Sequence, residues 1–105
     1  MTDIADRLEG MLRAGRDDPI LRYTLAKHYL EAGETDKALA HAKVAVELDA
    51  DYSAGWRLLG QVQVAAGQRE AAAAAFARGI EVAERRGDRQ VAREMRVFLR
   101  RLSKQ

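Results

Sequence analysis

The side chains that could carry out chemistry in this 105-residue chain are few and widely spaced. There is no cysteine, which excludes disulfides, thiolate zinc sites and cysteine nucleophiles. The two histidines, His28 and His41, match no metal-ligand spacing, and no G-x-x-x-x-G-K phosphate loop occurs. The serines are Ser53 and Ser103, and Ser53 follows Asp51 at the expected start of a helix, where a capping role explains it. We therefore expect a protein that is not an enzyme and that binds no metal and no cofactor.

Arginines are the most concentrated chemical group, and they gather near the C-terminus. Residues 85–105 hold eight basic and two acidic residues, a sum of +6, whereas residues 1–84 sum to −4. Four arginines recur at helical spacing, opposite the expected apolar side of the last helix: Arg89, Arg93, Arg96 and Arg100. One interpretation, which we favour, is a solvated outer face of a capping helix. The other is a patch for an acidic partner or a nucleic acid, and nucleic acid is unlikely because no aromatic residues interleave the arginines.

The chain carries no sign of secretion or of a membrane span. The N-terminal stretch MTDIADRLEG has acids where a signal peptide has bases, and no apolar run approaches the length of a membrane span. We expect a cytoplasmic protein of one domain, residues 1–105. Phe98 and Leu99 are adjacent, and one apolar stripe of the last helix needs only one of them. The other could contact a second copy of the chain, so we expect a monomer or a weak homodimer.

Apolar residues recur at helical spacing along the whole chain, and no segment alternates with period two. The fold class expected is therefore all-α, with about six helices. Short linkers make consecutive helices antiparallel neighbours. The expected boundaries are marked by Gly15, Asp18-Pro19, Gly33, Leu48, Gly67 and Gly87.

Two stretches of the chain repeat at an offset of 34 residues. The matched pairs are Asp17 and Asp51, Leu25 and Leu59, Ala32 and Ala66, Gly33 and Gly67, Ala38 and Ala72, Ala40 and Ala74, and Glu47 and Glu81. A fixed period of this length is typical of a helical solenoid.

The spacing within each repeat resembles the tetratricopeptide repeat, whose pattern is W-x-x-L-G-x-x-Y followed by Ala, Phe and a late Pro. Residues 53–86 carry Trp56, Leu59, Gly60, Gly67, Ala72 and Phe76, and residues 19–52 carry Leu25, Ala26, Tyr29, Gly33 and Ala38. Arg22 stands in place of the first Trp, and neither repeat has the late Pro. The resemblance implies a right-handed superhelical array of antiparallel helix pairs. An N-terminal helix over 3–16 and a C-terminal capping helix over 88–103 would flank the two repeats.

Residue size in the repeats predicts how the helices pack. Small residues are expected where the helices of a pair cross: Ala26, Ala38, Gly60 and Ala72. Large apolar residues should fill the gaps between pairs, and among them we expect Trp56 to be a buried indole and Phe76 to be buried.

The resemblance also implies that the first helix of each repeat lines a concave groove. The positions carried over to this groove are Tyr23, Lys27, Leu30, Arg57, Gln61 and Val64, to which an offset of 36 residues adds Arg93, Val97 and Arg100 from the last helix. Tyr23 would stack on a ligand, Lys27 and Arg57 would pair with carboxylates, and Gln61 would hydrogen-bond a peptide backbone.

The expected function is a non-catalytic protein–protein interaction scaffold that binds a peptide or protein segment in this groove. The partner is an unidentified protein or peptide, and the groove would favour an acidic one. The set of Lys and Asn residues with which some relatives clamp C-terminal carboxylates is absent. The alternative is a small protein that binds an acidic partner or a nucleic acid through its arginine-rich last helix.

Overall fold

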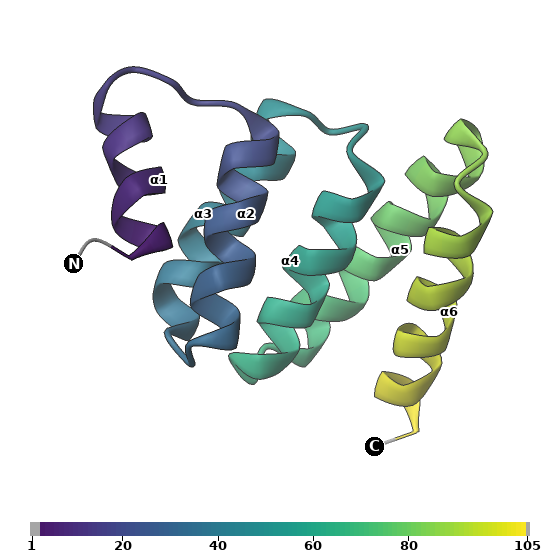
Figure 1. Cartoon of the computed structure of the whole chain (residues 1–105). Helices are drawn as coiled ribbons and strands as arrows, with labels where there is room; N and C mark the ends of the chain where they lie inside the picture. The colour runs from purple at the N-terminus through teal and green to yellow at the C-terminus, as the bar shows by residue number, and fades with distance from the viewer. Residues whose placement is uncertain (1–2, 105) are drawn as a thin grey trace.

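The computed structural model describes residues 3–104, which form helices and no strand (Figure 1). The six helices in this range are α1 (Ile4–Arg13), α2 (Pro19–Glu31), α3 (Thr35–Leu48), α4 (Ser53–Ala65), α5 (Arg69–Arg86) and α6 (Arg89–Ser103). The prediction of an all-α fold with about six helices is confirmed. None of the described helices is both long and apolar enough to cross a membrane.

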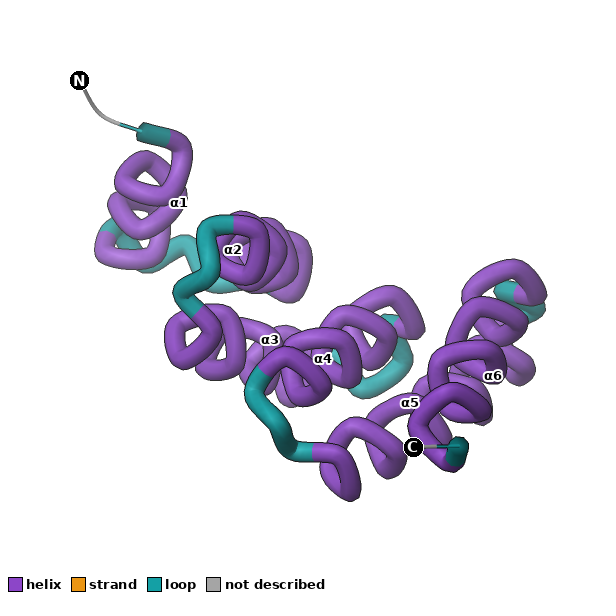
Figure 2. The backbone as a smooth tube through the Cα atoms, turned by 90° about the horizontal axis from the view of Figure 1, so that it is seen from below, coloured by secondary structure: helices purple, strands orange, loops and turns teal. Residues whose placement is uncertain are grey.

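The helices stack in one direction, as in a solenoid. Each helix packs against the next one in the chain, and α4 also contacts α2 and α6. The stack follows an arc, with α2, α4 and α6 along its inner side and α3 and α5 along its outer side (Figure 2). We call the surface formed by α2, α4 and α6 the inner face. The molecule is elongated as a result, measuring 43 × 29 × 19 Å.

The expected boundary signals act at both ends of α2. Asp18 Oδ1 accepts a hydrogen bond from the Leu21 backbone N–H at 2.8 Å, and Pro19 occupies the first helical position, where its missing N–H is harmless. The turns after α2 and α4 pass through Gly33 and Gly67, whose φ angles are +78° and +76°. Only glycine adopts this left-handed conformation without strain, so these two residues end their helices as predicted.

Close contact between neighbouring helices depends on very small residues. Ala26, Ala38 and Ala72 have no exposed surface, as the repeat pattern predicts. Gly60 lies directly against the ring of Phe76, and a Cβ at this position would overlap three ring carbons. Helices α4 and α5 can therefore approach each other only because Gly60 has no side chain.

Gly79 permits a second close contact, about a turn beyond Phe76 on α5. A Cβ at Gly79 would overlap the sulfur of Met95 on α6, and it would lie 2.8 Å from the Cβ of Trp56 on α4. Met95 is completely buried. The sequence offered no account of Gly79, and the structure explains it as the point where α4, α5 and α6 meet.

Trp56 differs from the expectation of a buried indole. Its side chain is half-buried at the edge of the core, and Nε1 donates a hydrogen bond to the Ala50 carbonyl at 2.8 Å. The physical reason is the polar end of the indole, which needs an acceptor and finds one in the loop between α3 and α4. Phe76, which has no such requirement, is 1% exposed, as expected.

A chain of polar contacts joins the first three helices. The Arg22 guanidinium donates from Nε to Asp17 Oδ1 at 2.8 Å, and its NH1 lies 3.0 Å from His41 Nδ1. Because a guanidinium can only donate, we assign Nδ1 as the acceptor, which leaves the imidazole proton on Nε2, 3.0 Å from Glu9 Oε1. The imidazole also stacks on Tyr29, with ring centres 5.6 Å apart. The surroundings therefore hold His41 as a neutral ring.

We predict that Gly60→Ala destabilises the protein by about 1–3 kcal/mol, because the added methyl group overpacks the contact with Phe76. The matched control is Gly10→Ala in α1, where a Cβ would meet only the mobile end of Arg13 at 3.8 Å. Helix propensity should make this control more stable, by up to about 1 kcal/mol. Urea denaturation of both variants measures the difference, and a Gly60→Ala protein as stable as the wild type would contradict the close packing.

We predict that the free energy of unfolding falls as the pH drops below about 6.5, the usual pKa of histidine. Burial lowers the pKa of His41 in the folded protein, against an opposing effect of Glu9. The unfolded chain, with a histidine pKa near 6.5, binds the proton more readily. Stability that is present above this pH is therefore lost as the pH falls through the folded pKa of His41.

The pH effect is checked by urea denaturation of the wild type and of His41→Gln at each pH. The variant should show a flatter profile in this range, because it lacks the group that titrates. A wild-type stability that rises towards the lower pH would mean that the attraction of Glu9 outweighs burial, and that the neutral ring is wrongly assigned.

Candidate functional site

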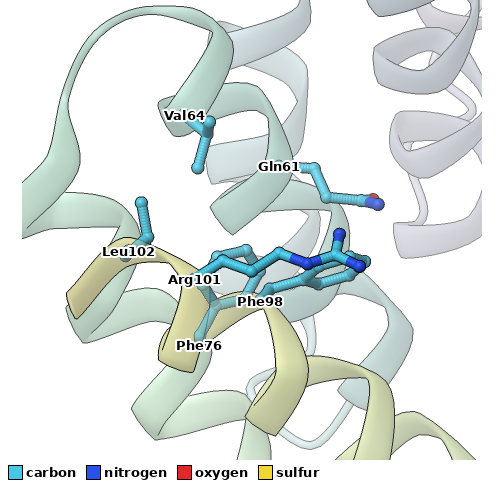
Figure 3. Close-up of a pocket in the computed structure, with 6 residues that line it drawn as sticks. All are labelled: Gln61, Val64, Phe76, Phe98, Arg101 and Leu102. Atoms are coloured by element: carbon cyan, nitrogen blue, oxygen red, sulfur yellow. The ribbon is translucent and has the colours of Figure 1, made fainter. Parts of the chain in front are cut away.

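The inner face contains a pocket between α4, α5 and α6 (Figure 3). Its volume is about 240 Å³, and its lining residues are Gln61, Val64, Phe76, Phe98, Arg101 and Leu102. Four of the six are apolar, whereas Gln61 and Arg101 carry polar groups at the ends of their side chains. We call this cavity the α4–α6 pocket.

The apolar floor of the pocket follows directly from the helix packing. Gly60 lets the Phe76 ring lie against α4, and Phe76 in turn contacts Phe98, with ring centres 5.4 Å apart and ring planes at 39°. Leu102 is nearly buried one turn further along α6, where its carbonyl accepts a hydrogen bond from the Arg69 guanidinium of α5. The floor is therefore built from side chains that also hold α5 and α6 together.

Two polar contacts fix α6 relative to α4 at the other end of the helices. Ser53 Oγ donates to Asp88 Oδ2 at 2.7 Å, so the start of α4 is linked to the residue before α6. This corrects the capping role expected for Ser53. One turn on, Arg57 NH1 lies 3.0 Å from Glu94 Oε1. Arg57 therefore has a carboxylate partner within the protein, which changes the role expected for it in the groove.

The groove positions expected on α2 lie apart from the α4–α6 pocket. Tyr23 is half-buried and packs on Tyr52, with ring centres 5.6 Å apart. Lys27 is exposed and has no ion pair within residues 3–104, and Leu30 is half-buried against the core. The structure thus brings Gln61 and Val64 together in one cavity and leaves Tyr23, Lys27 and Leu30 along the neighbouring helix.

Three arginines of the predicted stripe line a different hollow from the α4–α6 pocket. Arg93, expected in both the groove and the arginine stripe, lines a hollow of about 390 Å³ with Arg89 and Arg96 beside the turn between α5 and α6. Arg96 pairs there with Glu84. Arg100 is exposed further along the helix. Arg93 is therefore grouped with the stripe and not with Gln61 and Val64.

Sequence reasoning missed Phe98 and Arg101 as pocket residues. An offset of 37 residues relates Gln61 to Phe98 and Val64 to Arg101. The sequence prediction instead carried the groove positions of α4 over to α6 with an offset of 36. One residue corresponds to a rotation of about 100° around a helix, which is enough to select the wrong side. Helix α5 has 18 residues and α3 has 14. This difference indicates that the spacing from α4 to α6 is longer than the spacing from α2 to α4.

The groups that line the α4–α6 pocket are suited to binding. Within residues 3–104, no cluster of three or more histidine, cysteine, aspartate or glutamate side chains could hold a metal ion. The pocket itself contains no nucleophile, carboxylate or imidazole. It can enclose an apolar group on Phe76 and Phe98, and it can offer donors from Gln61 and Arg101 at its edge.

Comparisons with known proteins agree with this architecture. A family model described as tetratricopeptide repeat matches residues 2–62 and again residues 29–93. A TPR repeat-containing protein from Pseudomonas aeruginosa is 45% identical over 97 residues, which make up 92% of this chain and 92% of the relative.

Solved structures extend the likeness to three dimensions. The solution structure of a protein from Bordetella parapertussis matches with a TM-score of 0.84 at 43% identity, covering 99% of this chain and 90% of that chain. The crystal structure of a tetratricopeptide repeat domain protein from Salinibacter ruber matches with a TM-score of 0.76 at 30% identity, covering 82% of this chain and 97% of that chain. From the matching family model, the 45% identical relative and these shared folds, we conclude that the chain belongs to the tetratricopeptide repeat family.

Proposed function

We propose that this protein is a non-catalytic scaffold that holds a segment of another protein on its inner face. Members of the family generally mediate protein–protein interactions, which supports the general role. The observation that carries the specific proposal is the α4–α6 pocket, which joins Gln61 and Val64 of one helix to Phe98 and Arg101 of another. A partly apolar cavity with a few polar groups at its edge is the usual form of a binding site.

The size of the pocket favours a protein segment over a small molecule. Pockets for drug-sized ligands and cofactors enclose roughly 300–1,000 Å³, whereas the α4–α6 pocket encloses about 240 Å³. It has room for one side chain and opens onto the inner face, along which the rest of a segment can lie. Lys27 and Tyr23 on α2 are then available for contacts beyond the pocket.

The arginine stripe is the second candidate surface. Arg89, Arg93 and Arg96 line one hollow, and neither Arg89 nor Arg93 has an ion pair within the described residues. An acidic partner could use these two guanidinium groups. The residues around the hollow are mostly charged and exposed, however, so binding there would bury little apolar surface. A solubilising role remains the simpler interpretation of the stripe.

We predict that peptides selected for binding to the wild-type protein bind Val64→Asp at least about 10-fold more weakly. A carboxylate in the apolar pocket would repel a buried aliphatic or aromatic group, and burying one such side chain contributes about 1.5–3 kcal/mol. Val64 is 45% exposed, so the substitution should leave the fold intact, which circular dichroism checks. The measurement is selection from a random 12-residue display library, followed by titration of the selected peptides.

The double variant Arg89→Gln, Arg93→Gln is the matched control, because it alters the stripe and leaves the pocket unchanged. Peptides bound on the inner face should bind this control like the wild type. Binding that is lost in the control and kept in Val64→Asp would assign the function to the stripe. A selection that enriches no peptide at all would contradict the proposed function.

A further inference from the structure

We infer that the α4–α6 pocket recognises one apolar side chain followed closely by an Asp or Glu side chain, within an internal segment of a partner protein. The inference rests on the proposed function and names the chemistry of its ligand. It follows from three properties of the pocket: an apolar floor of limited size, one available cation at the edge, and a position near helix C-termini.

The floor selects an apolar group of moderate size. Phe76 and Leu102 are nearly buried, Phe98 is half-buried, and Val64 closes the side formed by α4. A charged group placed on this floor would lose its hydration without gaining a partner. A dry cavity of roughly 150 Å³ accommodates benzene, so about 240 Å³ accommodates a Leu, Met or Phe side chain without reorganisation.

The edge of the pocket selects a carboxylate. The Arg101 side chain extends beside Phe98 and carries its guanidinium towards the amide of Gln61 (Figure 3). No carboxylate pairs with Arg101 within residues 3–104, whereas Arg57, the neighbouring cation of the inner face, is paired with Glu94. A ligand carboxylate at this edge would gain a charge-assisted hydrogen bond from Arg101, which is exposed in the free protein and would be partly covered by the bound segment on its Phe98 side. The same guanidinium would repel a Lys or Arg side chain.

The backbone around the pocket favours a side-chain carboxylate over the C-terminal carboxylate of a partner. Gln61 and Val64 lie in the second half of α4, and Phe98, Arg101 and Leu102 lie in the second half of α6. Helix C-termini carry partial negative charge and present carbonyl groups, not N–H groups. A main-chain carboxylate at the edge formed by α4 and α6 would therefore meet two unfavourable dipoles beside Arg101, and the favourable N-terminal end of α5 lies on the other side of the floor, towards Phe76. A Glu or Asp side chain can reach Arg101 from outside while the apolar residue fills the cavity.

The test uses five short synthetic peptides and the full chain labelled with ¹⁵N. The reference peptide is acetyl-Gly-Ser-Leu-Glu-Ser-Gly-amide, and three matched peptides replace its Glu by Gln, its Glu by Lys, or its Leu by Ala. The fifth peptide, acetyl-Gly-Ser-Gly-Ser-Leu with a free C-terminus, offers the terminal carboxylate. Backbone amide shifts give each Kd, and the shifts should centre on Gln61, Val64, Phe98 and Arg101.

We expect the Leu-Glu peptide to bind the wild type at least about 10-fold more tightly than the Ala-Glu and Leu-Lys peptides. It should also bind more tightly than the Leu-Gln peptide and the peptide with the free C-terminus. In Arg101→Gln, the ratio between the Leu-Glu and Leu-Gln peptides should fall to about 1 while the Leu-Gln peptide still binds. Arg100→Gln removes the same charge from the neighbouring position, which is exposed outside the pocket, and should keep the wild-type ratio.

Three results of the peptide titrations would overturn the inference. They are a preference for Glu over Gln that survives in Arg101→Gln, a Leu-Lys peptide that binds as well as Leu-Glu, or tighter binding of the free C-terminus. Display-selected peptides that perturb the pocket while none of the synthetic probes binds would also reject this ligand chemistry and leave the proposed function intact. Failure of the display selection itself would reject both.

Discussion

The close approach of α4 and α5 at Gly60 is the constraint on which the rest of the molecule depends. Because Gly60 has no Cβ, the Phe76 ring can lie directly against the backbone of α4, and Gly79 accommodates Met95 and Trp56 in the same way one turn further on. The ring then contacts Phe98, which places α6. The same two rings line the floor of the α4–α6 pocket. Packing and binding surface therefore share the same side chains, so a change in one alters the other.

The position of α6 depends on apolar contacts for its stability and on polar contacts for its alignment. Met95 and Ala92 are buried against α5, and burial of such surface is the larger energetic contribution. Partly exposed ion pairs such as Arg57–Glu94 contribute at most about 1 kcal/mol. Together with the Ser53–Asp88 hydrogen bond, this pair sets how far α6 is displaced along α4. That displacement determines which α6 side chains face Gln61 across the pocket.

The sequence predicted the helices, the left-handed glycines at their ends and the small residues at the crossings, because each of these depends on local conformation or on a fixed spacing. It did not predict the half-buried state of Trp56, which depends on a carbonyl six residues away at Ala50. It also grouped Arg93 with Gln61 and Val64, whereas Arg93 lines a different hollow. Counting residues between helices fixes where α6 starts and not how α6 is rotated about its axis. The rotation results from Met95 packing on Gly79, a contact that no periodicity contains.

The pairing of charges likewise depends on contacts between distant residues, which the sequence does not predict. Composition gives the number of cations in the chain, but it does not say which of them lie on the inner face or are already paired with a carboxylate of the protein. Arg57 has an internal partner, Lys27 stands in open solvent, and Arg101 borders an apolar floor. Electrostatic attraction is weak where water surrounds both charges and stronger where apolar surface displaces that water. Arg101 is exposed like the arginines of the stripe, but it lies beside Phe98 at the edge of the apolar floor. It can therefore discriminate between ligands more sharply than the arginines of the stripe.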